Sequence, residues 1–184
     1  MHKCRFSVGA AAFVGALILV QSGFAGTAPA AAAPSPSAPL DAGTLEEISA
    51  LYHTLIDAEN RHDLAAARTM VWDSPSTLFV AKTATAAEGN WAGFWGIDVV
   101  MQHFQDLYQG PFVMAPDYSR AETVGLTADV AETYAPLNIT VAYAGQTPTP
   151  KPFLMIVTWL RTPTGWKMAT DVALPIPPTL RQGN

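Results

Sequence analysis

The stretch from Lys151 to Leu174 constrains the fold more than any other part of this chain, because its pattern predicts two long strands joined by a tight turn. β-Branched and aromatic residues fill both arms, and Pro163 and Gly165 mark the turn. The first arm, Phe153 to Arg161, is apolar on both faces, whereas an antiparallel strand with one face in water alternates between apolar and polar residues. We therefore expect the hairpin to lie in the middle of a sheet, with helices on one face and another surface on the other.

The second arm of the hairpin carries one acidic residue, Asp171, in an otherwise apolar segment. Strict alternation places these residues on two faces: Trp166, Met168, Val172 and Leu174 on one, and Lys167, Ala169, Asp171 and Ala173 on the other. A carboxyl buried there would have a raised pKa and would serve as an acid or a base. The structural alternative is an aspartate at the rim of the sheet, paired with Lys167 or Arg161.

The N-terminal segment has the pattern of an export signal, so we expect a secreted or periplasmic protein. Basic residues that include Lys3 and Arg5 precede an apolar run, Phe6 to Val20, which is too short to span a bilayer comfortably. We predict a signal peptide over residues 1–25 and no membrane span after its cleavage; the alternative is an uncleaved anchor. Residues 26–40, rich in Ala and Pro, predict an extended linker.

Charge and cysteine content exclude several functions. The chain carries 10 Lys and Arg against 15 Asp and Glu, and loss of Lys3 and Arg5 with the signal would leave a net charge of −7. No basic run exists, and nucleic acid binding needs clustered Lys and Arg, so we expect no nucleic acid partner. The single cysteine, Cys4, precedes the apolar run. The mature chain is therefore expected to have no thiol chemistry and no disulfide, and to depend on its core for stability.

Helical periodicity predicts three helices. Thr44 and Glu47 form a capping box before the first helix, whose apolar residues recur at steps of three and four. Asp63 is the predicted N-cap of a second helix, Leu64 to Val71, and a third helix is predicted over Ile97 to Tyr108.

Strand patterns complete the expected fold. Beyond the hairpin, three strands are predicted, over Ser76 to Ala81, Tyr118 to Gly125 and Asp129 to Tyr143. Lys82 to Gly96, with its glycines, is predicted to be a loop, and Pro136 to mark a bulge or an edge segment. The order of elements is typical of an α+β domain, in which a curved antiparallel sheet wraps around three N-terminal helices in a cone-shaped, cystatin-like arrangement. We assign this domain to residues 41–176, followed by a C-terminal tail over 177–184.

Three pieces of local sequence occur in an order that is typical of a known superfamily. They are the polar link Asn60 to Asp63, the entry to the third helix with Trp91, Gly93, Gly96 and Val100, and the closing sequence Thr158 to Met168. In this order they resemble the nuclear transport factor 2-like superfamily, in its SnoaL-like and ketosteroid isomerase-like branch. The resemblance covers Leu45 to Leu174. It implies a cone that opens on an apolar pocket for a small organic molecule, and an outer sheet face that pairs two copies into a homodimer.

The resemblance also implies positions for site residues. The steroid isomerase members use a tyrosine on the first helix and two aspartates on strands, and Tyr52 matches the tyrosine. The aspartates would fall near Phe79 or Val80 and near Val157 or Thr158, where this chain has no carboxylate. Steroid isomerisation by that pair of aspartates is therefore not expected.

The candidate catalytic residues are Asp171, His103 and Tyr52. Tyr52 is predicted to donate a hydrogen bond to a ligand carbonyl, or to be a core tyrosine. His103 flanks the apolar stripe of its predicted helix. It is expected to be a general base, a ligand contact or a buried structural histidine. The predicted ligand pocket consists of Tyr52, Trp72, Trp91, Trp95, His103, Thr158 and Asp171, although the tryptophans are equally expected from ordinary packing.

Three functions remain open from the sequence. The first is a ligand-binding domain without catalysis. The second is an isomerase, cyclase or lyase that uses Asp171 or His103 as acid–base with Tyr52 as donor. The third is a dimerisation module without a ligand. No two histidines share metal-ligand spacing with a carboxylate, and no phosphate loop or dinucleotide fingerprint occurs, so we expect neither a metal nor a cofactor.

Overall fold

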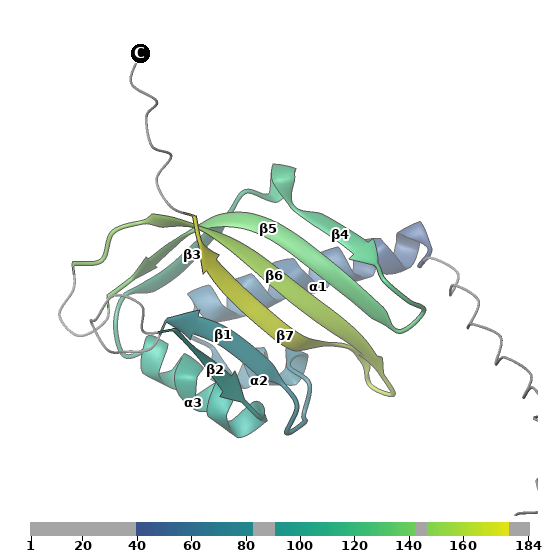
Figure 1. Cartoon of the computed structure of the whole chain (residues 1–184), viewed down its shortest axis with the longest axis horizontal. Helices are drawn as coiled ribbons and strands as arrows, with labels where there is room; N and C mark the ends of the chain where they lie inside the picture. The colour runs from purple at the N-terminus through teal and green to yellow at the C-terminus, as the bar shows by residue number, and fades with distance from the viewer. Residues whose placement is uncertain (1–39, 83–90, 143–146, 177–184) are drawn as a thin grey trace, which may run out of the picture. The chain divides into compact units, whose positions relative to one another are not determined.

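The computed structural model describes residues 40–82, 91–142 and 147–176 (Figure 1). The predicted signal peptide, the predicted linker apart from Leu40, and the predicted tail at 177–184 lie outside the described residues. No helix within the described ranges is long and apolar enough to cross a membrane.

Three α-helices form where the periodicity predicted them: α1 (Ala42–Asn60), α2 (Leu64–Met70) and α3 (Ile97–Leu107). The predicted start of α1 is wrong, because Asp41 and not Thr44 is its N-cap. The Asp41 carboxylate accepts hydrogen bonds from the Thr44 amide and the Thr44 hydroxyl, both at 2.9 Å. A carboxylate is favoured at a helix N-terminus, where the macrodipole is positive. The predicted cap of α2 is confirmed, since Asp63 accepts from the Ala66 amide at 2.9 Å.

The described strands form one seven-stranded sheet in the order β2-β1-β7-β6-β5-β3, with β4 also pairing with β5. The strands are β1 (Leu78–Lys82), β2 (Trp91–Trp95), β3 (Phe112–Pro116), β4 (Glu122–Gly125), β5 (Val130–Val141), β6 (Lys151–Thr162) and β7 (Gly165–Pro175). The predicted α+β fold class is confirmed, with one correction. The sheet is mixed, because β1 runs parallel to β7.

Two strands were missed by the sequence analysis. β2 lies inside the segment Lys82 to Gly96 that was predicted to be a loop, and it pairs antiparallel with β1. Gly96 follows it with a φ of 88°, a left-handed conformation that suits glycine, and the chain then enters α3. β3 was also missed, and the predicted strand Tyr118 to Gly125 begins instead with a short 3-10 helix, Tyr118–Arg120. Local pattern failed here because pairing with β1 and β5 decides these segments.

Pro136 lies in β5 at a point where one side of the strand has no ladder. β4 pairs with β5 up to Tyr134, and β3 pairs with it from Leu137 onward. The missing N–H of proline is tolerated at such a gap. The predicted edge segment is therefore found at Pro136. The predicted bulge is not, because the pairing of β5 with β6 continues through this residue without a register shift.

The closing hairpin is confirmed, but a bulge changes which β7 residues face the core. Gly165 takes a φ of 99° at the turn, and β6 and β7 pair along their length. One residue, Ala169, has no partner in this ladder, so the alternation of faces reverses there. Met168 and Asp171 are consequently both buried. The predicted division of β7 into two faces is therefore wrong.

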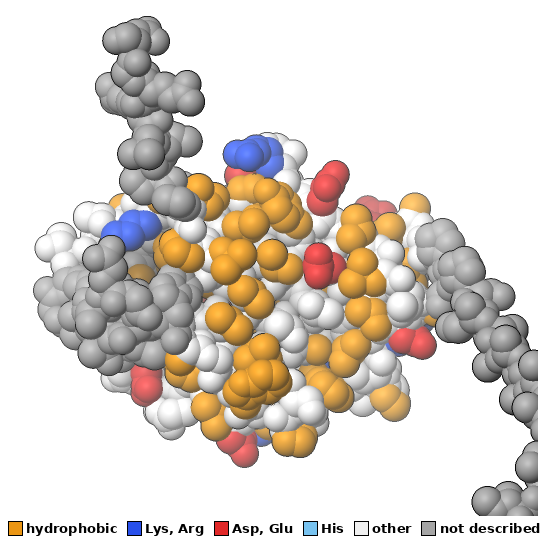
Figure 2. Space-filling model, in the orientation of Figure 1, with side chains coloured by type: hydrophobic (Ala, Val, Ile, Leu, Met, Phe, Trp, Pro, Cys, Tyr) orange, Lys and Arg blue, Asp and Glu red, His pale blue; other side chains and the backbone are white. Residues whose placement is uncertain are grey.

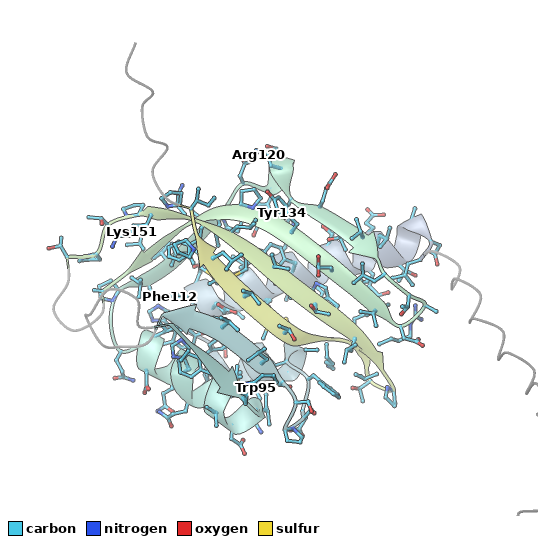
Figure 3. The ribbon with its side chains drawn as sticks, in the orientation of Figure 1. Trp95, Phe112, Arg120, Tyr134 and Lys151 are labelled. Atoms are coloured by element: carbon cyan, nitrogen blue, oxygen red, sulfur yellow. The ribbon has the colours of Figure 1, made fainter. Side chains whose placement is uncertain are left out.

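The core lies between the helices and the inner face of the sheet, with α1 running behind β5 and β6 in Figure 1. The opposite, outer face is strongly apolar, and Figure 2 shows hydrophobic side chains gathered over its strands. Its apolar residues include Leu78, Val80, Trp95, Tyr134, Leu154, Ile156, Val172 and Leu174. Three of them are well exposed: Trp95 at 60%, Tyr134 at 43% and Leu174 at 41% (Trp95 and Tyr134 are labelled in Figure 3).

Candidate functional site

Helix α1 brings two polar side chains to the core. Tyr52 and Glu59 are seven residues apart, which is about two helical turns, and they therefore share a face. Tyr52 is 1% exposed and Glu59 is 2% exposed. Sequence reasoning missed Glu59, although the three- and four-residue steps from Ile48 through Tyr52 and Leu55 lead directly to it. A carboxyl on an apolar stripe was the available signal.

The C-terminal end of α1 is fixed by a clamp to β3. The Asn60 side chain donates to the Met114 carbonyl at 2.8 Å and accepts from the Met114 amide at 2.7 Å. His62 Nε2 donates to the carbonyl of Phe112 at 3.1 Å (Phe112 is labelled in Figure 3). The His62 ring also stacks on Tyr108 of α3, with 4.8 Å between ring centroids. These contacts hold the backbone beside Glu59 in one position.

Strand β7 brings Asp171 to the same interior. Its register partners are Val157 on β6 and Phe79 on β1, and its side chain is 1% exposed. Burial raises the pKa of Asp171 to about 8, and a backbone hydrogen bond from Val172 opposes this shift only in part. The rim alternative is not what the structure shows, because Arg161 pairs with Asp129 at 3.7 Å.

Four buried polar groups interact electrostatically, and we call Tyr52, Glu59, Tyr108 and Asp171 the buried polar cluster. Burial raises the pKa of Glu59 well above 4.5, and the charge of Asp171 raises it further. Burial also raises the pKa of Tyr52, with contributions from Asp171 and then Glu59. Burial also raises the pKa of Tyr108, and the charge of Glu59 adds a smaller shift in the same direction. Asp171 is therefore largely protonated at neutral pH, and burial favours the protonated form of Glu59 as well.

Each member of the buried polar cluster has one atom without a hydrogen-bond partner among the described residues. These atoms are the hydroxyl oxygens of Tyr52 and Tyr108, Oε1 of Glu59 and Oδ1 of Asp171. A buried polar atom left unpaired costs about 1–3 kcal/mol. Four such atoms in one apolar interior call for a functional explanation. Chemically, the groups of the cluster can donate and accept protons or hydrogen bonds.

His103 lies in a different environment. Its side chain is 5% exposed, and its ring stacks on Phe94 of β2 with 3.9 Å between centroids. Burial lowers the pKa of His103 to about 4, against a smaller opposing effect of Asp106. His103 lines a surface hollow of about 320 Å³ along α3, together with Phe94, Asp98, Val99, Gln102 and Asp106. The centroids of the Phe79 and His103 rings are 5.3 Å apart. Neither carboxyl of the buried polar cluster contributes to the pKa shift of His103.

The other predicted pocket residues are not brought to the cluster. Trp95 lies on the outer face, because it belongs to β2 and pairs there with Leu78, an outer-face residue of β1. Thr158 also lies on the outer face, adjacent in β6 to the inward-facing Val157. Trp72 is half-buried, and its amide donates to Met168 at 2.8 Å. The side chain of Trp91 lies outside the described part of the chain. Within that part, no group of three or more His, Cys, Asp or Glu is placed to hold a metal ion.

Comparisons with known proteins agree with this architecture. No family model matches the sequence, and no curated protein matches it. A ketosteroid isomerase-like protein from Erwinia carotovora atroseptica is 18% identical with a TM-score of 0.58, over 75% of this chain and 100% of that one. A nuclear transport factor 2-like superfamily protein from Salmonella enterica serovar Typhimurium is 13% identical with a TM-score of 0.61, over 77% and 98%. A proposed dehydratase of the same family from Streptomyces avermitilis is 14% identical with a TM-score of 0.59, over 75% and 100%.

These likenesses define the class of fold. Three helices packed on an open, mixed sheet are the architecture of an α+β cone. The chain has the nuclear transport factor 2-like fold, also seen in the ketosteroid isomerase-like protein, and the predicted resemblance to that superfamily is confirmed at this level. The SnoaL-like branch stays a prediction. The identities are low, and a shared fold does not carry a shared activity.

Proposed function

We propose that this domain binds a small, largely apolar organic molecule in its interior, with the buried polar cluster contacting the polar group of that molecule. The observation that supports this is the set of four buried polar atoms without partners. A ligand that pairs these atoms recovers the free energy that the unliganded domain lacks. Apolar side chains around a few convergent polar groups are typical of small-molecule sites. No catalysis is assigned.

Ligand-observed NMR with a panel of small aromatic ketones, alcohols and amines tests this proposal. We expect at least one compound to bind, and Tyr52→Phe or Asp171→Asn to change its affinity up to about tenfold, as loss of one hydrogen bond predicts. Asp129→Asn is the matched control, because it changes the same group at an exposed position. Equal binding by the cluster variants and the control would place the ligand elsewhere and refute the proposal.

A second candidate, an acid–base enzyme, is favoured by one observation. Asp171 lies buried near Tyr52, and a pKa of about 8 suits proton transfer near neutral pH. The Streptomyces avermitilis structure is of a proposed dehydratase, a reaction of this kind. Exchange of the α-protons of a bound ketone for deuterium, followed by NMR, is the assay. The exchange should follow a group titrating near pH 8 and should vanish in Asp171→Asn; unchanged exchange in that variant rules this candidate out.

We also propose that two copies pair through the outer face. Trp95, Tyr134 and Leu174 are well exposed on this face, and large apolar patches on soluble proteins mark interaction sites. Sedimentation should show a dimer of the domain at micromolar concentration, and Tyr134→Glu should give a monomer. Tyr118→Glu, at a similarly exposed tyrosine away from the outer face, should stay dimeric. A wild-type monomer would refute the pairing. The dimerisation module without a ligand would gain support if the domain dimerises and no small molecule binds.

Export remains part of the proposal and rests on the N-terminal pattern alone. Expression of the full chain in a bacterial host, followed by N-terminal sequencing of the secreted or periplasmic product, tests it. The expected mature chain begins near residue 26. Retention of the first 25 residues on a membrane-bound product would support the anchor instead.

A further inference from the structure

One edge of the sheet, at β3, has its outward backbone groups bonded by side chains. Asn60 bonds both the amide and the carbonyl of Met114, and His62 Nε2 donates to the Phe112 carbonyl. Pro116, at the end of β3, has no N–H to offer. An exposed strand edge is a template for pairing with another chain, and natural proteins therefore block such edges. The clamp to α1 blocks this edge of the sheet in that way.

The opposite edge, at β2, carries no such protection among the described residues. β2 is the terminal strand of the sheet and pairs only with β1 there, and it lies beside α3 in Figure 1. Its sequence, Trp91–Trp95, includes no proline and no charged residue, and its pairing with β1 proceeds without a register shift. A flat, apolar edge of this kind favours the addition of a further strand.

The ladder between β1 and β2 shows which backbone groups of β2 point outward. The Gly96 amide donates to the Thr77 carbonyl at 2.8 Å, one step beyond the last residue pair of the ladder. Hydrogen-bonded and non-hydrogen-bonded pairs alternate in an antiparallel ladder, so Phe94 directs its N–H and C=O groups to β1. Those of Gly93 and Trp95 consequently point away from the sheet. Gly93 has no side chain, which lets a second backbone approach closely.

The hollow of about 320 Å³ described above lies where β2 meets α3. It is lined by Phe94 of β2 and by Asp98, Val99, Gln102, His103 and Asp106 of α3. Phe94 stacks on His103, and Val99 is 49% exposed, so the middle of the hollow is apolar and a carboxylate lies toward each end. Successive side chains of a strand point to opposite faces, so every second side chain of an added strand would point toward this hollow.

The two carboxylates of the hollow set the sequence that an added strand would need. Asp98 and Asp106 are eight residues apart on α3, or about 12 Å along its axis. Side chains four residues apart in a strand lie on one face at a spacing of about 13 Å. Asp98 contacts Arg68 at 3.2 Å in an exposed and therefore weak pair, and Asp106 accepts from Gln102 at 2.9 Å. Basic side chains at positions i and i+4 therefore match the carboxylates, with an apolar side chain at i+2 between them.

We propose that β2 takes up an extended peptide of another protein as an additional strand, with a basic–x–apolar–x–basic pattern facing α3. The outward N–H and C=O groups of Gly93 and Trp95 pair with the peptide backbone, and the hollow along α3 receives its side chains. In strand addition, main-chain hydrogen bonds supply affinity and side-chain pockets supply specificity. This site is separate from the buried polar cluster and goes beyond the proposed binding of a small molecule.

Titration of ¹⁵N-labelled protein with the peptide TKTLTKT, acetylated and amidated at its ends, tests the proposal by NMR. We expect saturable shifts of the backbone amides of β2. Hydrogen exchange at Gly93 and Trp95 should slow on binding, whereas the Phe94 amide should be protected with or without peptide. The neutral counterpart TQTLTQT should bind more weakly, by up to about fivefold for each lysine replaced, as expected for exposed ion pairs.

Two N-methylated versions of the lysine peptide test the backbone pairing itself. One carries methyl groups on the amides of both lysines and the leucine, and the other on the amides of the two inner threonines. Only alternate N–H groups of an added strand point to its neighbour, so one version should lose binding and the other should keep it. Equal binding by both versions, or loss of binding by both, would overturn strand addition.

Charge variants of the protein test the role of the hollow. Asp98→Asn combined with Asp106→Asn should remove the preference for the lysine peptide and leave affinity for the glutamine peptide unchanged. Asp129→Asn is the matched control, because it changes an exposed carboxylate that pairs with Arg161 on β6, and it should keep the preference. A preference that survives in the double variant, or is lost in the control, would overturn the assignment to this hollow. Absence of shifts in β2 at millimolar peptide would overturn the proposal and leave small-molecule binding in the interior untouched.

Discussion

The substitution Asp171→Asn should remove part of the pH dependence of folding stability. The pKa of Asp171 rises from 3.8 to about 8 on folding, because its carboxyl is buried. Between these values the folded state binds a proton that the unfolded state has lost, so the free energy of unfolding falls as pH rises. Each pKa unit corresponds to about 1.4 kcal/mol, so the whole shift amounts to about 6 kcal/mol. Asparagine imitates the protonated acid in shape and hydrogen bonding, and it does not ionise.

The interval from pH 6.5 to 8 isolates this effect from that of His103. Burial lowers the pKa of His103 from 6.5 to about 4, so its contribution to stability changes below pH 6.5 and with the opposite sign. Between pH 6.5 and 8 the Asp171 proton should cost the wild type about 1.5 kcal/mol. Glu59 also has a raised pKa and adds to the same slope. Asp171→Asn should show a slope smaller by this amount and should be more stable than the wild type at pH 8.

Urea denaturation followed by tryptophan fluorescence at half-unit steps of pH gives the required free energies. Glu59→Gln should reduce the slope in the same direction, and Asp129→Asn, at an exposed position, should leave it unchanged. The same slope in the wild type and in Asp171→Asn would refute the argument, because it would mean that Asp171 ionises in the folded state as it does in the unfolded one.

Three further substitutions test other contacts of the core. Burial of neutral His103 should cost the wild type up to about 3 kcal/mol as pH falls from 6.5 to 4. The buried carboxyls stabilise the fold over the same range, so the His103 effect is the difference between the wild type and His103→Gln, which should gain more stability on acidification in thermal melts. Asn60→Ala removes both hydrogen bonds to Met114 and should cost about 1–3 kcal/mol in urea denaturation. Thr133→Val leaves the indole N–H of Trp159 unpaired and should cost about 1–3 kcal/mol by the same measurement.

Controls for these variants lie on the surface. Asn138→Ala changes an exposed asparagine of β5 and should leave the urea midpoint nearly unchanged. An Asn60→Ala variant as stable as Asn138→Ala would show that the clamp on β3 contributes nothing. A His103→Gln variant with the acid sensitivity of the wild type would show that this histidine is protonated in the fold. Full stability of Thr133→Val would mean that water or another group satisfies the indole.

Local pattern was sufficient for the elements whose residues carry their own periodicity. The apolar stripe of α3 predicted its bounds to within one residue, and Asp63 marked the start of α2. The hairpin of β6 and β7 followed from composition and from its turn. Tyr52 was placed on the inward side of α1 for the same reason. A helix stripe or a strand run needs no distant residue to be recognised.

The structure of β2 and the contents of the site depended on partners far along the chain. Trp95 was expected at the pocket, and pairing with β1 places it on the outer face. Glu59 follows from the stripe of α1 once acidic residues are allowed on it, but its significance depends on Asp171, more than 100 residues away. Neither the parallel pairing of β1 with β7 nor the bulge at Ala169 has a local signal.

The helices, the closing hairpin, the acidic charge and the apolar character of both faces of β6 could all be predicted from the amino-acid pattern alone. The inward direction of Asp171, its electrostatic effect on Glu59 and Tyr52, and the separate position of His103 follow from the three-dimensional packing. Hydrophobic periodicity is a property of neighbouring residues, whereas the face on which a strand residue lies depends on the register of the whole ladder. A single unpaired residue in β7 was enough to turn a carboxyl into the core.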